Sequence, residues 1–181
     1  MRVIPDIDVE RAQARTTVTY ALLPSLSVGL EFNPVANDLG PLANWRVWDE
    51  EENRPALIVG TSSDRIGPES GRAFFATLSK DLEGLTGLPI APYAGASYGE
   101  FDHETVAIGG LFVRWAERWS STHLLDGHNL HHVLSHAYEE GPVVGLVVVE
   151  LDGVYSVGLT VGTSFAAGSG ANGETAPVSD G

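Results

Sequence analysis

The fold is decided by the stretch Val154-Tyr155-Ser156-Val157-Gly158-Leu159-Thr160-Val161-Gly162-Thr163-Ser164-Phe165. Because successive side chains of a strand point to opposite faces, this stretch has two unlike faces. One face reads Tyr155, Val157, Leu159, Val161, Thr163, Phe165, and the other reads Val154, Ser156, Gly158, Thr160, Gly162, Ser164. The first face is mostly apolar, and the second is small or weakly polar and lacks Lys, Arg, Asp and Glu. Such alternation favours a strand with lipid outside and a tight, weakly polar barrel interior.

Residues 26–33 repeat this pattern near the beginning of the chain. Leu26, Val28, Leu30 and Phe32 alternate with Ser27, Gly29, Glu31 and Asn33. The run Ser27-Val28-Gly29-Leu30 is matched by Ser156-Val157-Gly158-Leu159. Self-similarity of this kind is expected of a fold built from repeated hairpins.

Turn residues recur at short intervals along the chain, which has 21 glycines in 181 residues. This spacing favours an all-β fold. We expect strands at residues 16–23, 26–33, 55–61, 72–82, 89–99, 105–115, 119–125, 132–138, 142–151 and 154–165. Residues 33–54 are expected to form a long polar connection with at most a short strand around residues 45–48. The prediction is a single antiparallel up-and-down β-barrel of roughly ten strands, with a range of about eight to twelve.

The domain limits follow from composition. Residues 1–15 form a polar N-terminal segment, residues 16–165 the barrel, and residues 166–181, rich in Gly, Ser and Ala, a disordered tail. Residues 142–151 are apolar on both faces, which indicates a strand buried on both sides.

Charge and cysteine content exclude several function classes. The formal net charge is −14 and no basic cluster is present, so nucleic acid is not an expected partner. The absence of cysteine excludes disulfides, thiol catalysis and cysteine-ligated metals. No segment has the roughly 18 apolar residues of a membrane helix. Residues 1–6 lack the apolar run of a secretory signal, so export would need a signal that this sequence does not contain.

Charged and aromatic residues also have a distinctive placement. Among the acidic residues, only Glu31, Asp81 and Glu150 fall within expected strands. A charge on a lipid-facing strand costs roughly 2–4 kcal/mol near mid-membrane, so strands in lipid should be depleted of charge. Aromatic side chains gather at expected strand ends, where barrels place them at the membrane interfaces: Phe32, Tyr98, Trp115, Trp119, Tyr138, Tyr155 and Phe165.

With these features the chain resembles the outer-membrane β-barrel class of Gram-negative envelopes. The resemblance rests on the amphipathic final strand, residues 155–165, which ends in phenylalanine, and on short turns at residues 24–25, 116–118 and 152–153. It implies an outer-membrane location, membrane lipid as a partner, and use of the last strand as an assembly signal. Some lipid hydrolases of that class use a serine and a histidine near the membrane edge.

Three sets of residues are candidate functional groups. If the face of Ser27 and Gly29 is the lumen, Glu31 lies in it and needs an arginine partner, either Arg72 or Arg114, because an unpaired buried charge is costly. Ser121 and His123 are two residues apart on one strand and therefore share a face, as a nucleophile and its base would.

The third set is a group of histidines that suggests a metal site. Five of the six histidines fall between residues 123 and 136. A helix over residues 127–140 would bring His128, His132 and His136 onto one face, whereas a strand would bring together only His132 and His136. No cofactor is expected.

These observations lead to three hypotheses for function. The first is an outer-membrane barrel with a structural role or a role in passage of a small solute, and without enzymatic activity. The second is a soluble β-barrel or sandwich that binds an apolar small ligand in its interior. The third is a metal-dependent or serine-histidine hydrolase that uses residues 123–136.

Overall fold

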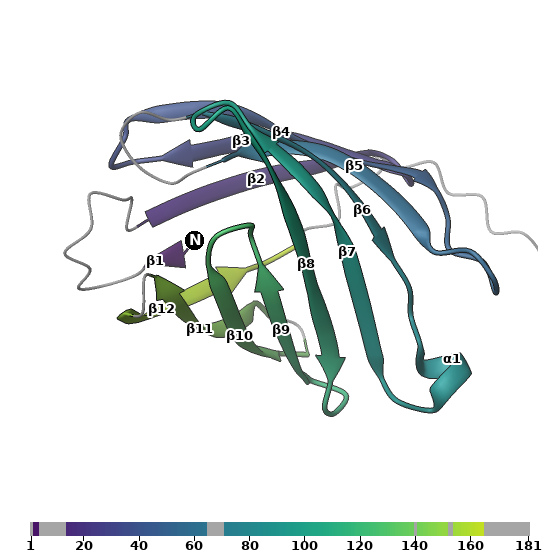
Figure 1. The fold of residues 1–181 in the computed structure, drawn as a ribbon. Helices are drawn as coiled ribbons and strands as arrows, with labels where there is room; N and C mark the ends of the chain where they lie inside the picture. Colours follow the sequence, from purple (N-terminus) through teal and green to yellow (C-terminus); the bar gives the residue numbers. More distant parts are fainter. Residues whose placement is uncertain (1, 4–13, 65–70, 140, 152–153, 165–181) are drawn as a thin grey trace, which may run out of the picture.

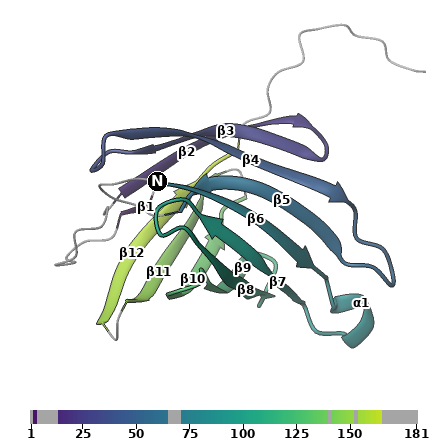
Figure 2. The same cartoon turned by 45° about the horizontal axis from the view of Figure 1, so that its top comes forward.

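The chain forms one antiparallel sheet in which every strand pairs with the next strand in sequence. The structure is a computed structural model that describes residues 2–3, 14–64, 71–139, 141–151 and 154–164. Over these residues the strands are β1 (Arg2–Val3), β2 (Ala14–Leu23), β3 (Leu26–Asn33), β4 (Asp38–Trp48), β5 (Ala56–Ser63), β6 (Arg72–Ser79), β7 (Ile90–Gly99), β8 (Glu104–Arg114), β9 (Trp119–Leu125), β10 (Leu130–Ala137), β11 (Val143–Leu151) and β12 (Val154–Gly162). The predicted all-β, antiparallel up-and-down architecture is confirmed. The sheet curls so that β2–β4 and β9–β12 lie on opposite sides (Figure 1), and the rotated view in Figure 2 shows the same arrangement.

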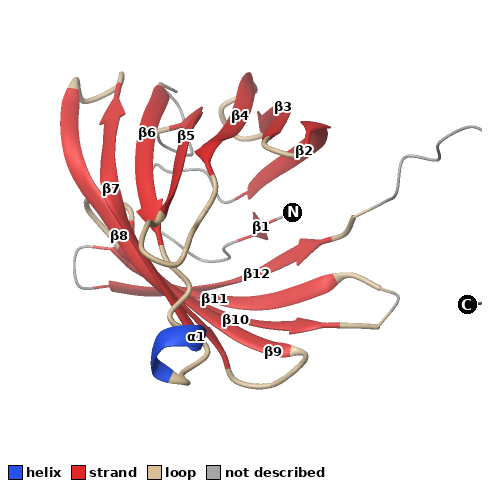
Figure 3. Ribbon diagram, turned by 90° about the vertical axis from the view of Figure 1, so that its right-hand side faces the viewer, coloured by secondary structure: helices blue, strands red, loops and turns tan. Residues whose placement is uncertain are grey.

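Closure of the sheet rests on its shortest strand. In the meander from β2 to β12 the two end strands run in the same direction and do not pair with each other. β1 lies between them and is antiparallel to both, with Arg2 opposite Thr160 on β12 and opposite Arg15 on β2. Figure 3 shows β1 as a short arrow between β2 and β12. This twelfth strand makes the number even, so every pair around the barrel is antiparallel.

The two faces of the sheet have the composition expected from β12. Tyr155, Val157 and Leu159 are exposed on the outer face, while Ser156 between them is buried on the inner face. On the neighbouring β11, Leu146 is 45% exposed, whereas Val147 is 1% exposed. The prediction that this strand is buried on both sides is therefore wrong, because its second apolar face lies on the outside of the barrel.

Few hydrophobic side chains are fully buried inside this barrel. The buried hydrophobic residues among the described positions are Ala56, Ala73, Val147 and Val149. Val133 on β10 packs against the two valines of β11 and completes the one small core cluster of the described residues. The fully buried core is thus small, while large hydrophobic side chains such as Val157 and Leu159 are exposed on the outer face.

The largest error of the sequence prediction is the segment from residue 33 to residue 54. It was expected to be a polar connection, but Asp38–Trp48 is the eleven-residue strand β4. Pro41 pairs with Leu30 of β3 but lies outside the β4–β5 register, which begins at Ala43. A missing N–H is tolerated there because no β5 residue is paired with this position.

Smaller differences concern strand boundaries. β6 ends at Ser79, so Asp81 lies outside the strands. Residues 130–137 form β10, so the alternative helix over residues 127–140 does not form. β1 and the first two residues of β2 fall inside the segment that was expected to be polar and N-terminal to the barrel. Phe165 and the predicted disordered tail lie outside the described residues.

The helix content of the described chain is a single turn, α1 (Glu83–Thr86), between β6 and β7. In the described residues, no helix has the length and apolar character needed to traverse a bilayer.

Candidate functional site

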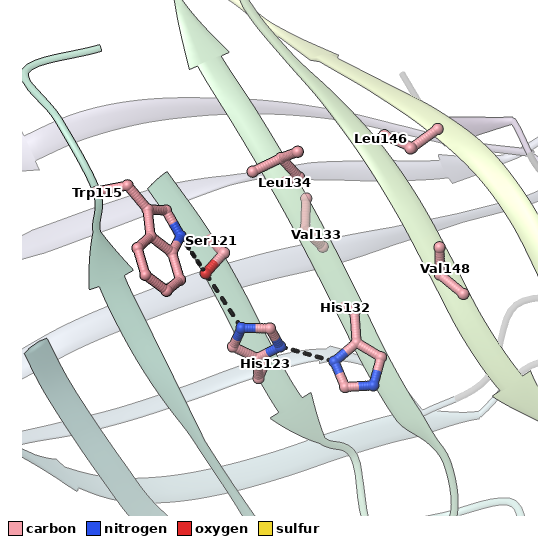
Figure 4. A pocket seen from close by; sticks show the side chains of 8 residues that line it. All are labelled: Trp115, Ser121, His123, His132, Val133, Leu134, Leu146 and Val148. Carbon is pink, nitrogen blue, oxygen red and sulfur yellow. Dashed lines mark hydrogen bonds between the residues drawn. The ribbon is translucent and has the colours of Figure 1, made fainter. Parts of the chain in front are cut away.

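A group of polar side chains lies on the outer face of β8–β10. Ser121 and His123 belong to β9, His132 belongs to β10, and Trp115 directly follows β8 (Figure 4). This group stands out because the outer face around it is apolar, with Leu134, Leu146 and Val148 beside the histidines.

The register of the β9–β10 hairpin brings the two histidines together. Its loop is short because Asp126 Oδ1 accepts hydrogen bonds from the backbone N–H groups of His128 (3.0 Å) and Asn129 (2.7 Å). Gly127 in the same loop has φ +108°, a backbone conformation that favours glycine. With this loop, His123 lies directly opposite His132. Directly opposite residues of an antiparallel pair are close enough for their side chains to interact.

A continuous chain of hydrogen bonds connects the four side chains. Trp115 Nε1 donates to Ser121 Oγ at 2.9 Å, and Ser121 Oγ lies 3.1 Å from His123 Nε2. His123 Nδ1 lies 2.7 Å from His132 Nδ1, and the two rings meet edge to face with centroids 4.9 Å apart. All three distances are within normal hydrogen-bond range.

The indole group allows this chain to run from the serine toward the histidines. An indole N–H only donates, so it occupies a lone pair of the Ser121 hydroxyl and leaves the hydroxyl proton free. That proton can be donated to His123 Nε2, which requires His123 to carry its own proton on Nδ1 and to donate it to His132 Nδ1. In this arrangement a serine hydroxyl is bonded to the unprotonated nitrogen of a histidine that a third group orients, which is the pattern of an activated nucleophile.

The same residues line a shallow hollow in the outer surface. Its volume is about 310 Å³, and Ser121, His123 and His132 share its wall with Trp115 and with aliphatic side chains of β10 and β11. Ser121 is 5% exposed, whereas Trp115 is exposed.

The loop beside the site contains a second hydrogen-bonded pair. His131 Nε2 lies 2.6 Å from Asp126 Oδ2. Burial raises the pKa of Asp126, but the hydrogen bonds from His131, Asn129 and His128 outweigh this effect and hold the pKa at about 2. Asp126 is therefore ionised at neutral pH and stabilises the turn that sets the hairpin register.

The predicted lumen residues do not form the expected pairs. Glu31 is 3% exposed on the inner face, and its partners are Arg15 at 3.4 Å and the Ser63 hydroxyl. Arg72 lies 3.3 Å from Asp38. Arg114 pairs with Glu83 of α1. The expectation that Arg72 or Arg114 would pair with Glu31 is wrong, because both are bonded to other carboxylates.

The histidines proposed as metal ligands are separated in the structure. His128 lies in the β9–β10 loop, and His132 is bonded to His123. His136 is on the same face as His132 but packs between the rings of Trp119 (4.6 Å) and Tyr138 (4.7 Å). Within the described ranges, no group of three or more histidine and acidic side chains is close enough to hold a metal ion.

Two participants were not identified from the sequence. Trp115 was expected only as an interfacial aromatic, and nothing in its sequence position indicated a bond to Ser121. The partnership of His132 with His123 would have followed from the correct loop length, because the positions of two paired residues in a hairpin are fixed by its loop.

Comparisons of the chain with protein-family models, with curated proteins and with solved structures found no match.

Proposed function

We propose that the chain is an integral β-barrel protein of an outer-membrane-type bilayer, with a structural role or a role in passage of a small solute. The observation that carries this proposal is the inverted distribution of apolar side chains. Val157 is 50% exposed and Leu159 is 56% exposed on the outer face of β12, while the inner positions that alternate with them are Ser156, Gly158 and Thr160. A water-soluble protein seldom exposes a contiguous apolar surface of this extent.

The apolar surface extends around the sheet. Exposed large hydrophobic side chains occur on most strands, including Val18, Leu30, Leu39, Phe74, Leu78, Leu134, Leu146, Val157, Leu159 and Val161. Because β2–β12 belong to one continuous curled sheet, this band extends around most of the molecule and is not a local patch. A belt of apolar side chains around a barrel is the surface that lipid wets.

Strand lengths and aromatic positions also support the proposal. β4 and β8 have eleven residues and β2 and β7 have ten, which is enough to cross a bilayer at a tilt of about 45°. The four tryptophans and the exposed Tyr138 lie at one end of the barrel, and four other exposed Phe and Tyr side chains lie at the opposite end. The tryptophans are Trp45, Trp48, Trp115 and Trp119, and the residues of the opposite end are Phe32, Phe74, Tyr98 and Tyr155. Two aromatic girdles are characteristic of a membrane barrel.

The inner face limits the role of the interior. Val147 and Val149 are almost fully buried there, and Glu31 is paired with Arg15. Its twelve strands place the barrel between eight-stranded barrels, whose interiors side chains fill, and porins of about 16–18 strands, which hold an aqueous channel. We therefore infer a structural protein or a path for small solutes and not a wide channel.

The test separates this proposal from a soluble β-protein that binds an apolar ligand. The chain should require detergent for extraction, should float with phospholipid vesicles after refolding, and should migrate as a compact species in dodecyl sulfate until it is boiled. A chain that is monomeric in buffer without detergent, and that shows no heat-dependent migration, would contradict the bilayer location.

A further inference from the structure

We propose that Ser121, His123 and His132 form a catalytic site on the outside of the barrel that hydrolyses acyl esters of membrane lipids. Ser121 and His123 would be the catalytic residues, and His132 a positioning residue. The lipid substrate class rests on the bilayer location proposed above, whereas the serine-histidine chemistry rests on the hydrogen bonds alone.

The first argument is the geometry of the three side chains. Ser121 Oγ is 3.1 Å from His123 Nε2, and the other ring nitrogen of His123 is 2.7 Å from His132. A nucleophile, a base and an orienting group are thus connected in the order that acyl transfer needs. The three residues come from two paired strands, so their positions are set by a rigid backbone ladder.

The second argument is the position of the serine along the barrel. Ser121 is two residues from Trp119, which begins β9 at the end where the tryptophans gather. Two residues of a strand tilted by about 45° correspond to roughly 5 Å along the membrane normal. Interfacial tryptophans lie at headgroup level, so the hydroxyl lies slightly below the headgroups. This is the depth at which the ester bonds of a glycerolipid join its headgroup region to its acyl chains.

The third argument is the lining of the hollow. Leu134, Leu146 and Val148 extend from the hydrogen-bonded group across β10 and β11. Such a surface is suited to an acyl chain that lies flat against the barrel, and it offers no charged group to a soluble anionic substrate. An ester of a bilayer lipid is therefore the substrate class that both the polar group and its apolar surroundings fit.

The proposed reaction is a two-step acyl transfer. Ser121 Oγ bonds to the ester carbonyl carbon while its proton passes to His123 Nε2. The carbon–oxygen bond to the glycerol then breaks, and that oxygen takes the proton and leaves as a lysolipid. Water next adds to the acyl carbon and gives a proton to Nε2, and the acyl–Oγ bond breaks as this proton returns to Oγ. One ester and one water give one carboxylic acid and one alcohol.

Trp115 is the side-chain donor placed to stabilise the oxyanion of this reaction. Its Nε1–H lies 2.9 Å from Ser121 Oγ and would be close to the carbonyl oxygen after attack. Backbone N–H groups of paired strands are used in the ladder, so a side chain has to supply this hydrogen bond. Replacement of Trp115 by Phe should lower kcat by about a hundredfold while the barrel remains folded.

The experiment uses the chain refolded into vesicles of phosphatidylethanolamine and phosphatidylglycerol, with mass spectrometry of fatty acid and lysolipid. The wild type should release both products in equal amounts, and Ser121→Ala should lower the rate at least about a hundredfold. The matched control is Ser120→Ala, because Ser120 is adjacent on β9 and points to the opposite face. Product formation at the level of empty vesicles, or an unchanged rate in Ser121→Ala, would overturn the catalytic assignment.

Two further variants test the role of His132. His132→Ala should lower kcat at nearly constant KM, and His132→Asn should restore much of the loss because its side-chain oxygen can accept the proton of His123 Nδ1. His136→Ala is the histidine control, because His136 shares the outer face of β10 but packs between two aromatic rings. Equal rates in His132→Ala and the wild type would remove His132 from the site.

A soluble ester keeps this result separate from the bilayer location. Insertion into vesicles without ester cleavage would refute the catalytic site and leave the membrane barrel intact. Cleavage of p-nitrophenyl butyrate that depends on Ser121, by a chain that does not enter vesicles, would refute the bilayer location and the lipid substrate class together.

Discussion

Replacement of Leu159 by arginine tests the bilayer location most directly. β12 has nine residues, and Leu159 lies five residues from its first residue and three from its last. At about 2.3 Å along the membrane normal for each tilted residue, Leu159 lies roughly 12 Å from one end and 7 Å from the other. Its exposed side chain is therefore well inside an apolar band of about 25 Å.

The expected cost of Leu159→Arg follows from this depth. Arginine on the lipid face costs about 2–4 kcal/mol at the midplane and about 0–1 kcal/mol near the interfaces. For a position slightly away from the middle we expect about 2–3 kcal/mol, which is a roughly 30- to 160-fold change in the unfolding equilibrium constant. In a water-soluble barrel the same change at an exposed site would stay within about 0.5 kcal/mol.

The assay is a urea titration in phospholipid vesicles, followed by the fluorescence of the four tryptophans. The matched control is Tyr155→Arg, because Tyr155 is exposed on the same strand but lies next to its end and opposite Glu150. This variant should lose no more than about 1 kcal/mol. If Leu159→Arg were as stable as Tyr155→Arg, the outer face would not be in hydrocarbon and the reasoning would be wrong.

Three other predictions concern the interior, the loops and the glycines. In a double-mutant cycle of Arg15→Met and Glu31→Gln, the coupling energy should be about 1 kcal/mol, since Glu31 is buried but Arg15 is partly exposed. Asp126 has a lowered pKa, so its contribution to stability is complete above about pH 4 and is lost as the pH falls through about 2. The unfolding free energy should drop by about 1 kcal/mol over this range. Asp126→Asn should remove that pH dependence. Gly95→Ala should destabilise the barrel, because a Cβ there would collide with the backbone carbonyl oxygen of Ala76 on β6. Gly84→Ala should not destabilise it, because the space around Gly84 is open. Chemical denaturation of both variants would show the difference.

The parts of the fold that the sequence predicted are the strands with a clear difference between their faces. The strand at residues 26–33 was predicted with the bounds that β3 has, and β9 was also predicted at residues 119–125. In β3 the outer positions carry Leu, Val and Phe and the inner positions carry Ser, Gly, Glu and Asn, so the period of two is unambiguous. Where one face is in an apolar environment, a shift by one residue would reverse every side chain, and the pattern therefore fixes the register.

β4 and β1 could not be predicted in this way. β4 contains Asp38, Gly40 and Pro41 near its beginning, residues that are rare in strands and that usually indicate a turn. It becomes a strand because β3 offers it a complete ladder, from Leu26 opposite Trp45 to Asn33 opposite Asp38. β1 has only two residues and is defined entirely by its neighbours, so no local pattern can indicate it.

The candidate site could not be predicted in full, because the expected start of β10 was wrong by two residues. Ser121 and His123 were recognised as a pair because they are two apart on one strand, which requires no knowledge of the neighbouring strand. The next strand was expected to begin at residue 132, which would place His123 opposite Leu134. The loop actually ends at Asn129, and this shift places His123 opposite His132. Asp126-Gly127 is a turn sequence, and its aspartate accepts hydrogen bonds from the N–H groups of His128 and Asn129. This turn sequence is the signal that would have predicted the shorter loop.

The polar group on the outer face has an energetic cost that stability does not explain. An unpaired polar group in hydrocarbon costs several kcal/mol, so in the proposed bilayer Ser121, His123 and His132 would be tolerated only because they bond to one another and to Trp115. Removal of one of these residues leaves its neighbours without a hydrogen-bond partner. Apolar residues at all three positions would need no hydrogen bond in an apolar environment. A fully apolar face would therefore be at least as stable as the one that is present. Polar residues that are dispensable for stability and arranged as nucleophile, base and orienting group are best explained by a chemical role, because functional sites are where proteins sacrifice stability.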